Sequence, residues 1–156
     1  MMIKLTKILY PTDFSELSLV ALKYAKSFAE QFQAQLHVLN VLDEAYQYWL
    51  TMGPEGLPMG PDINQMLDIS RKQMKDFVTE NFDDRHRTIA TVISGKPFIE
   101  IIRYARDEKI DMIIMATHGR SGLKSVMLGS VADRVVRKAP CPVLTIRSDT
   151  HDFVLP

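Results

Sequence analysis

A glycine-bearing stretch between residues 111 and 130 carries the pattern with the clearest chemical meaning. Residues 111–116 are an apolar run, residues 117–122 are small or polar and include Gly119 and Gly122, and Gly129-Ser130 follows shortly after. This order is typical of a strand, a loop and a helix. Glycine lets a backbone approach a bulky anion closely, and backbone N–H groups at a helix start bind phosphate oxygens. The stretch therefore predicts a site for the phosphates of a nucleotide.

Structural interpretations of the same residues stay open. Gly119 and Gly122 could be ordinary turn glycines, and Arg120 could be a solvated charge. His118 fits a hydrogen-bonding residue that orients the loop better than it fits a catalytic base. Asp13, which follows the first predicted strand, either contacts a ligand or caps the first helix.

Other catalytic and metal-binding patterns are missing from the sequence. The 4 histidines lie far apart, and there is no phosphate loop, dinucleotide-binding glycine motif or nucleophile elbow. The single cysteine, Cys141, excludes an internal disulfide and a cysteine metal cluster, and it is interpreted as a small buried hydrophobe. The sequence therefore predicts neither catalytic residues nor a metal held by protein side chains.

The charge balance argues against polyanionic partners. The 156 residues include 19 Lys plus Arg and 19 Asp plus Glu, so no basic field favours nucleic acid or an anionic membrane. The N-terminal segment is too short and too charged for a signal peptide, and no apolar run approaches the length of a membrane span. We expect a cytoplasmic protein.

The elements that must position these residues alternate between strand and helix patterns. Apolar β-rich runs predict strands at 7–11, 35–42, 88–94, 111–116 and 143–146. Helical spacing predicts helices from Ser15 to Phe32, from Asp62 to Phe82, from Pro97 through Ala105, and from Leu128 through Val136. Ser15 and Asp62 are the predicted N-caps, the latter in a capping box with Gln65. The inner faces of the first two helices are expected to include Tyr24, Phe32 and Ile63.

Residues 43–61 do not follow either pattern. They are rich in Gly and Pro and include Tyr46, Tyr48 and Trp49. A connection this long is uncommon in a compact domain unless it is functional or disordered. Both interpretations, a mobile surface loop and a lid over a ligand, stay open.

The alternation predicts one doubly wound α/β domain over residues 1–148, followed by a loose tail at 149–156. Five parallel strands with helices on both faces account for the whole pattern. A strand, a helix and a strand in close succession imply right-handed crossovers. We find no internal repeat and no second domain.

Several motifs of the chain together resemble the universal stress protein family. They are Pro11-Thr-Asp-Phe-Ser15, Gly95-x-Pro97, the segment 111–122, Gly129-Ser-Val-Ala-Asp-Arg-Val-Val136 and Pro140-Cys-Pro-Val-Leu144. The resemblance runs from Lys7 to Arg147 and spares the long loop and the tail.

This resemblance implies the strand order 3-2-1-4-5 and an ATP site at the carboxyl ends of the central strands. Nucleotide-binding members show Gly-x2-Gly-x9-Gly-Ser/Thr, and Ala116 stands here at the first glycine. Alanine disfavours positive φ, but a negative-φ backbone would tolerate it. A divalent ion such as Mg²⁺ would bridge phosphate oxygens more than protein side chains. The implied binding residues are Pro11, Thr12, Asp13 and Val41 at the adenine and ribose end, Met115, Ala116, His118, Gly119 and Arg120 along the loop, and Gly129, Ser130 and Val131 at the phosphates.

The implied function is that of a nucleotide-dependent switch or sensor in a stress response. Two alternatives stay open. One is a nucleotide-free dimeric interaction module, which Ala116 favours. The other is a slow ATP hydrolase or nucleotidyl transferase, for which no water-activating base is evident unless His118 or Asp13 serves. Homodimers are expected through the last strand, Val143–Ile146, because an unprotected sheet edge invites pairing. Coverage of that edge by the tail is the alternative.

Overall fold

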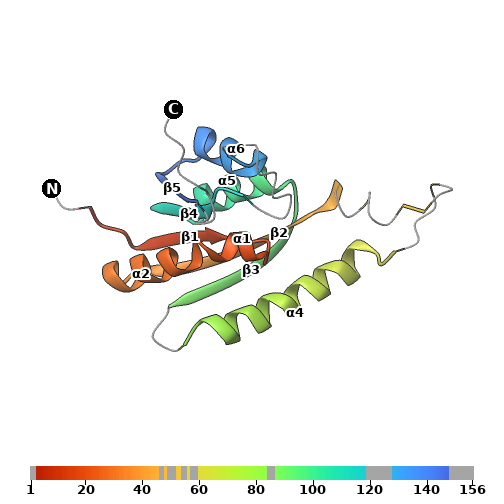
Figure 1. Cartoon of the computed structure of the whole chain (residues 1–156), viewed down its shortest axis with the longest axis horizontal. Coiled ribbons are helices and arrows are strands. Elements are labelled where there is room, and N and C mark those ends of the chain that lie inside the picture. The colour runs from red at the N-terminus through yellow and green to blue at the C-terminus, as the bar shows by residue number, and fades with distance from the viewer. Residues whose placement is uncertain are drawn as a thin grey trace.

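Five parallel strands form one sheet in the order β3-β2-β1-β4-β5 (Figure 1). The structure is a computed structural model that describes residues 3–45, 48, 52–53, 56, 60–83, 87–118 and 128–147. Gly119, Arg120, Gly122, most of the 43–61 connection and the tail lie outside these residues. The strands are β1 (Lys7–Pro11), β2 (Gln35–Asp43), β3 (Thr88–Gly95), β4 (Met112–Ala116) and β5 (Val143–Ile146). The predicted strands and their order are confirmed.

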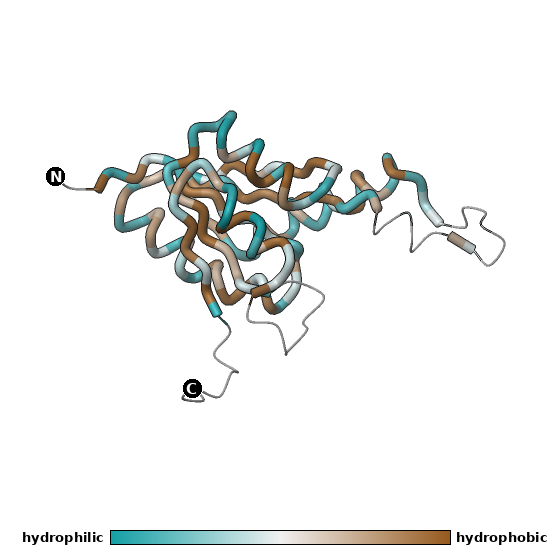
Figure 2. Tube along the Cα trace, turned by 90° about the horizontal axis from the view of Figure 1, so that it is seen from above, coloured by the Kyte–Doolittle hydropathy of each residue, from teal (hydrophilic) through white to brown (hydrophobic). Residues whose placement is uncertain are grey.

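Helices cover both faces of the sheet (Figure 1). One face carries α1 (Glu16–Leu19), α2 (Leu22–Phe32) and α4 (Ile63–Asn81), and the other carries α5 (Pro97–Asp107) and α6 (Ser130–Lys138). Successive strand residues point to opposite faces, so Ile8 and Tyr10 join the first core while Leu9 joins the second. Hydrophobic residues accordingly follow the strands through the interior (Figure 2). The predicted doubly wound α/β architecture is confirmed.

The first predicted helix is two helices, because its first turn is hydrogen-bonded to β1 at Ser18. Ser18 is buried, and its carbonyl oxygen accepts the Tyr10 hydroxyl at 3.0 Å and the Ala21 amide at 3.3 Å. These bonds tighten the backbone after Leu19 and break the α-helical register before α2 begins at Leu22. The prediction of one continuous helix was wrong at this point.

The helix faces also differ from the prediction at their aromatic residues. Tyr24 and Phe32 are each 37% exposed, whereas Leu22, Ala25 and Ala29 fill the inner face of α2. Small side chains let α2 approach the sheet closely, and this leaves the two larger rings at its sides. Ile63, in the first turn of α4, is also exposed, since the buried face of α4 is formed further along by Ser70, Met74 and Phe77.

The two predicted N-caps are confirmed, whereas the fourth helix begins at Ser130 and not at Leu128. Ser15 caps α1 by accepting the Ser18 amide, and Asp62 caps α4 by accepting the amides of Asn64 and Gln65 at 2.9 Å. The Gln65 side chain accepts the Asp62 amide at 3.1 Å, which completes the capping box. Among the described helices, none is both long and apolar enough to cross a membrane.

Candidate functional site

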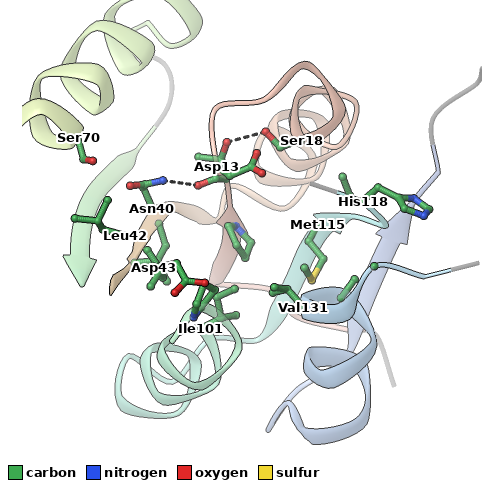
Figure 3. A pocket seen from close by; sticks show the side chains of 18 of the residues that line it. Asp13, Ser18, Asn40, Leu42, Asp43, Ser70, Ile101, Met115, His118 and Val131 are labelled. Atoms are coloured by element: carbon green, nitrogen blue, oxygen red, sulfur yellow. Dashed lines mark hydrogen bonds between the residues drawn. The ribbon is translucent and has the colours of Figure 1, made fainter. Parts of the chain in front are cut away.

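A cavity of about 570 Å³ lies at the carboxyl ends of the strands (Figure 3). β1 and β4 are neighbours at the centre of the sheet, where the chain order reverses, and open α/β sheets bind ligands at this point. The predicted binding residues that the structure describes all line the cavity: Pro11, Thr12, Asp13, Val41, Met115, Ala116, His118, Gly129, Ser130 and Val131. The fold therefore brings together residues from four separate segments of the chain.

Asp13 supports the start of α1 while lining the cavity. Its Oδ1 accepts the Ser15 amide at 3.0 Å and the Ser15 hydroxyl at 2.5 Å, and Ser15 in turn caps the helix. The helix cap is thus Ser15, and Asp13 orients it. These bonds fix the Asp13 carboxylate at the cavity wall.

The backbone beside Asp13 is held in a left-handed conformation. Phe14 has φ 62°, which is uncommon for a bulky residue. Two contacts hold it there: its amide donates to Thr12 Oγ1 at 3.0 Å, and its ring lies 5.6 Å from that of Phe77 on α4. Such strained positions cluster at functional sites, and this one fixes the path of the β1–α1 turn around Asp13.

Val41 presents backbone groups to the cavity because β2 is longer than β1. The last paired residues are Pro11 and Leu39, and the Thr12 amide donates to the Leu39 carbonyl at 2.9 Å. In a parallel ladder every second residue faces the same neighbour. The N–H and C=O groups of Val41 therefore point to the same side as those of Leu39, beyond the end of β1. This edge is suited to hydrogen bonding with a planar ring.

Asn40 and Ser70 are cavity residues that sequence reasoning missed. They are 4% and 7% exposed, and both line the cavity from the α4 side of the sheet. The Asn40 amide nitrogen donates to the Thr12 carbonyl oxygen at 2.9 Å. Two signals in the sequence could have found them. Asn40 interrupts the apolar run of β2, and Ser70 stands between Met66 and Met74 on the inner face of a helix.

Ala116 occupies the first glycine position without backbone strain. It is the last residue of β4, pairs with Ile146 and is 8% exposed, with its methyl group in the core. Extended backbone has negative φ, and Ala116 is not among the described residues with positive φ. The alanine is therefore compatible with the local structure.

Gly129 is required by a close approach of two backbone segments. Its amide donates to the Thr117 carbonyl oxygen at 2.8 Å, and a Cβ atom at this position would lie 2.8 Å from the same oxygen. Gly129 is also the N-cap of α6, so the first backbone N–H groups of this helix begin at the cavity wall. His118 hydrogen-bonds through Nδ1 to the Thr117 hydroxyl at 2.9 Å, which orients its ring beside this contact.

Acidic side chains line the described part of the cavity, whereas the nearby basic side chains lie outside its lining. Its described lining includes the carboxylates of Asp13 and Asp43 but no lysine or arginine. Lys96 and Arg134, which flank lining residues in sequence, lie over the Phe98 ring, with charged groups 5.8 and 4.8 Å from its centroid. In the described part of the chain, no three His, Cys, Asp or Glu side chains come together to hold a metal ion. Within the described lining, a phosphate-bearing ligand would therefore meet helix N–H groups and no basic side chain.

Comparison with known proteins agrees with the fold and the motifs. A sequence model of the Universal stress protein family matches residues 4–147. The chain is 34% identical over 152 residues to universal stress protein MJ0577 of Methanocaldococcus jannaschii, covering 90% of this chain and 94% of that protein. The chain belongs to the universal stress protein family.

Solved structures of universal stress proteins share this arrangement. The MJ0577 structure superposes with a TM-score of 0.74 at 29% identity, covering 96% of this chain and 100% of the other. UspA of Lactobacillus plantarum gives a TM-score of 0.69 at 27% identity, with 94% and 100% covered. A universal stress protein of Arabidopsis thaliana with AMP bound gives 0.57 at 19% identity, with 93% of each chain covered, and so shares the fold.

Proposed function

We propose that this universal stress protein binds an adenine nucleotide, ATP in the first instance, in the cavity at the carboxyl ends of β1 and β4. The observation that carries the proposal is the cavity itself. It combines the exposed backbone edge of Val41 at one end with the N-terminus of α6 at Ser130 at the other. The backbone edge of Val41 suits hydrogen bonds to a nucleobase, and the N–H groups at the start of α6 suit phosphates. The AMP bound to a family member of the same fold supports this proposal.

The bound nucleotide would act as a switch or sensor in a cytoplasmic stress response. The cavity borders helices on both faces of the sheet, so a ligand can bias how both layers pack. Mg²⁺ fits the charge of the site as a partner of the phosphates, because it commonly binds through substrate phosphates and one or two carboxylates. Asp13 and Asp43 are the carboxylates within the described lining. No residue is assigned a catalytic role.

The proposal is tested by changing the charge at the start of α6. Ser130 is exposed and is the first residue of the helix, where an aspartate is favourable to folding. In Ser130→Asp, the new carboxylate would face the phosphates. We expect ATP affinity to fall at least about tenfold, since like charges about 4 Å apart repel by about 1–4 kcal/mol between bulk water and a protein surface.

The measurement is calorimetric titration of nucleotide-stripped protein with ATP and Mg²⁺. Ser130→Asn is the matched control, because asparagine has the size of aspartate without its charge, so its ATP affinity should fall clearly less than that of Ser130→Asp. Equal binding by Ser130→Asp would place the phosphates elsewhere. Absence of ATP binding by the wild type would favour the nucleotide-free interaction module.

A further inference from the structure

The Asn40 side chain presents a fixed hydrogen-bond acceptor to the cavity. Its amide nitrogen is committed to the Thr12 carbonyl oxygen at 2.9 Å, so the amide cannot rotate by half a turn without losing this bond. Asn40 Oδ1 then has no protein partner among the described residues, and it is not sealed from solvent space. In Figure 3 the Asn40 oxygen points toward the side of the cavity formed by α4, opposite to the hydrogen bond of the Asn40 nitrogen.

Ser70 presents a second polar atom to the same space. It projects from α4 toward the side of the cavity that Asn40 Oδ1 faces (Figure 3). Its hydroxyl has no hydrogen-bond partner within the described part of the chain, although Ser70 is only 7% exposed. Neither oxygen is sealed from the cavity and neither bonds to a described residue, so both are open to hydrogen bonds from a ligand or water.

The chemistry of this wall favours a ligand that donates. Asn40 Oδ1 accepts only, a serine hydroxyl can accept or donate, and the nearby carboxylate of Asp43 accepts. A carbonyl oxygen of a ligand would face the Asn40 oxygen with no proton between them. An amine on a planar ring would supply N–H groups in the direction that both side chains require.

We propose that Asn40 and Ser70 form a subsite that recognises the exocyclic amine of the nucleobase and so selects a 6-aminopurine over a 6-oxopurine. The inference rests on the proposed nucleotide binding and adds its base specificity. Val41, the next residue of β2, holds the edge of the ring through its backbone. Asn40, on the α4 side of the same strand, receives the amine. Specificity then comes from buried acceptors that the wrong base leaves unpaired.

The test compares three triphosphates that differ at one position of the base: ATP, inosine triphosphate with a 6-oxo group, and purine riboside triphosphate with no 6-substituent. Titration with Mg²⁺ is expected to show ATP binding at least about tenfold tighter than purine riboside triphosphate, the effect of one buried hydrogen bond. Inosine triphosphate should bind no better than purine riboside triphosphate.

Two variants assign the selectivity to these side chains. Asn40→Leu removes the acceptor but also the bond to Thr12, so its fold is checked by thermal denaturation. Ser70→Ala removes a hydroxyl that bonds to no other described residue. Each should reduce the ATP preference severalfold, a ratio that general destabilisation would leave unchanged. The matched control is Thr79→Ala, also on α4, whose hydroxyl donates to the Lys75 carbonyl at 2.9 Å away from the cavity.

Each outcome decides the inference. Equal affinity of the wild type for ATP and purine riboside triphosphate would overturn the base-reading subsite and leave nucleotide binding intact. A preference unchanged in both variants would overturn the assignment to Asn40 and Ser70. Failure of all three triphosphates to bind would overturn both the inference and the proposed function.

Discussion

Ala116 ends β4 and Gly129 lies against the next residue, Thr117, and each fits a different steric requirement. Gly129 cannot carry a side chain without meeting the Thr117 carbonyl oxygen, whereas Ala116 uses its methyl group to fill the core. The alanine at the family's glycine position is therefore explained by the packing of its methyl group in the core. It does not by itself argue against a ligand.

Restoring the family's glycine at this position should cost stability. In Ala116→Gly, the loss of a buried methyl group and the added freedom of the unfolded chain should lower the free energy of unfolding by about 1–2 kcal/mol. Urea denaturation measures the change. ATP affinity should stay within about twofold, because the backbone at position 116 is already extended. A gain in affinity of tenfold or more would show that the methyl group obstructs the ligand.

At the scale of the elements, a buried histidine joins β2 to α5. His37 is 1% exposed, and its Nδ1 lies 2.9 Å from the Tyr104 hydroxyl while its Nε2 lies 3.2 Å from Gln35 Oε1. The Gln35 oxygen can only accept, so Nε2 carries the proton and Nδ1 accepts from Tyr104. Burial, together with the positive charge of Lys7, lowers the pKa of His37 below its usual value, although Glu108 acts in the opposite direction.

This lowered pKa makes the fold sensitive to mild acid. The unfolded chain takes up the His37 proton first, at a pKa of about 6.5, while the folded chain resists it. The free energy of unfolding should therefore decrease as the pH falls below about 6.5 and continue to decrease until the folded-state pKa is passed. In His37→Gln this part of the pH dependence should be absent. Denaturation curves give the free energy of unfolding of both proteins at each pH between 7.5 and 5. If this free energy decreased with falling pH by the same amount in both, the prediction would be contradicted.

The elements show which features local sequence predicts and which it does not. The capping box at Asp62 and the buried strand β4 depend on neighbouring residues, and both were predicted. The break between α1 and α2 depends on the hydrogen bonds that Ser18 makes with Tyr10 of β1 and with Thr12, just after β1. Asn40 and Ser70 line the same cavity only after α4 packs against the sheet. Contacts between distant segments carry no local pattern, and this is why they were missed.

At the scale of the whole molecule, β5 is an edge strand with which no other described strand pairs on its outer side. The carbonyl oxygens of Pro142 and Ile146 accept the amides of Ile113 in β4 and of Thr117 just after it, so by alternation the backbone groups of Val143 and Thr145 point outward. We propose that two chains pair along this edge, as expected for the family. Pairing across a two-fold axis would satisfy the outward groups of both copies.

A proline at an outward position tests this dimer. Thr145→Pro removes an outward N–H group without removing a bond to β4, so the chain should fold and elute as a monomer. Leu144→Pro is the contrasting variant, since it removes a bond to β4 and should destabilise the chain itself. Light scattering across a range of concentrations gives the mass. A wild-type monomer at all of them, or an intact Thr145→Pro dimer, would exclude pairing through β5.

The cavity touches α4 on one face of the sheet and α6 on the other, so a bound ligand would contact both helix layers at once. Amide hydrogen exchange should reveal this. Ligand should slow exchange in the first half of α4 and the first turn of α6 together, although the two helices lie far apart in sequence and on opposite sides of the sheet. In such a sensor, ligand binding would change how often the surface helices open locally, and the signal would need no movement of domains.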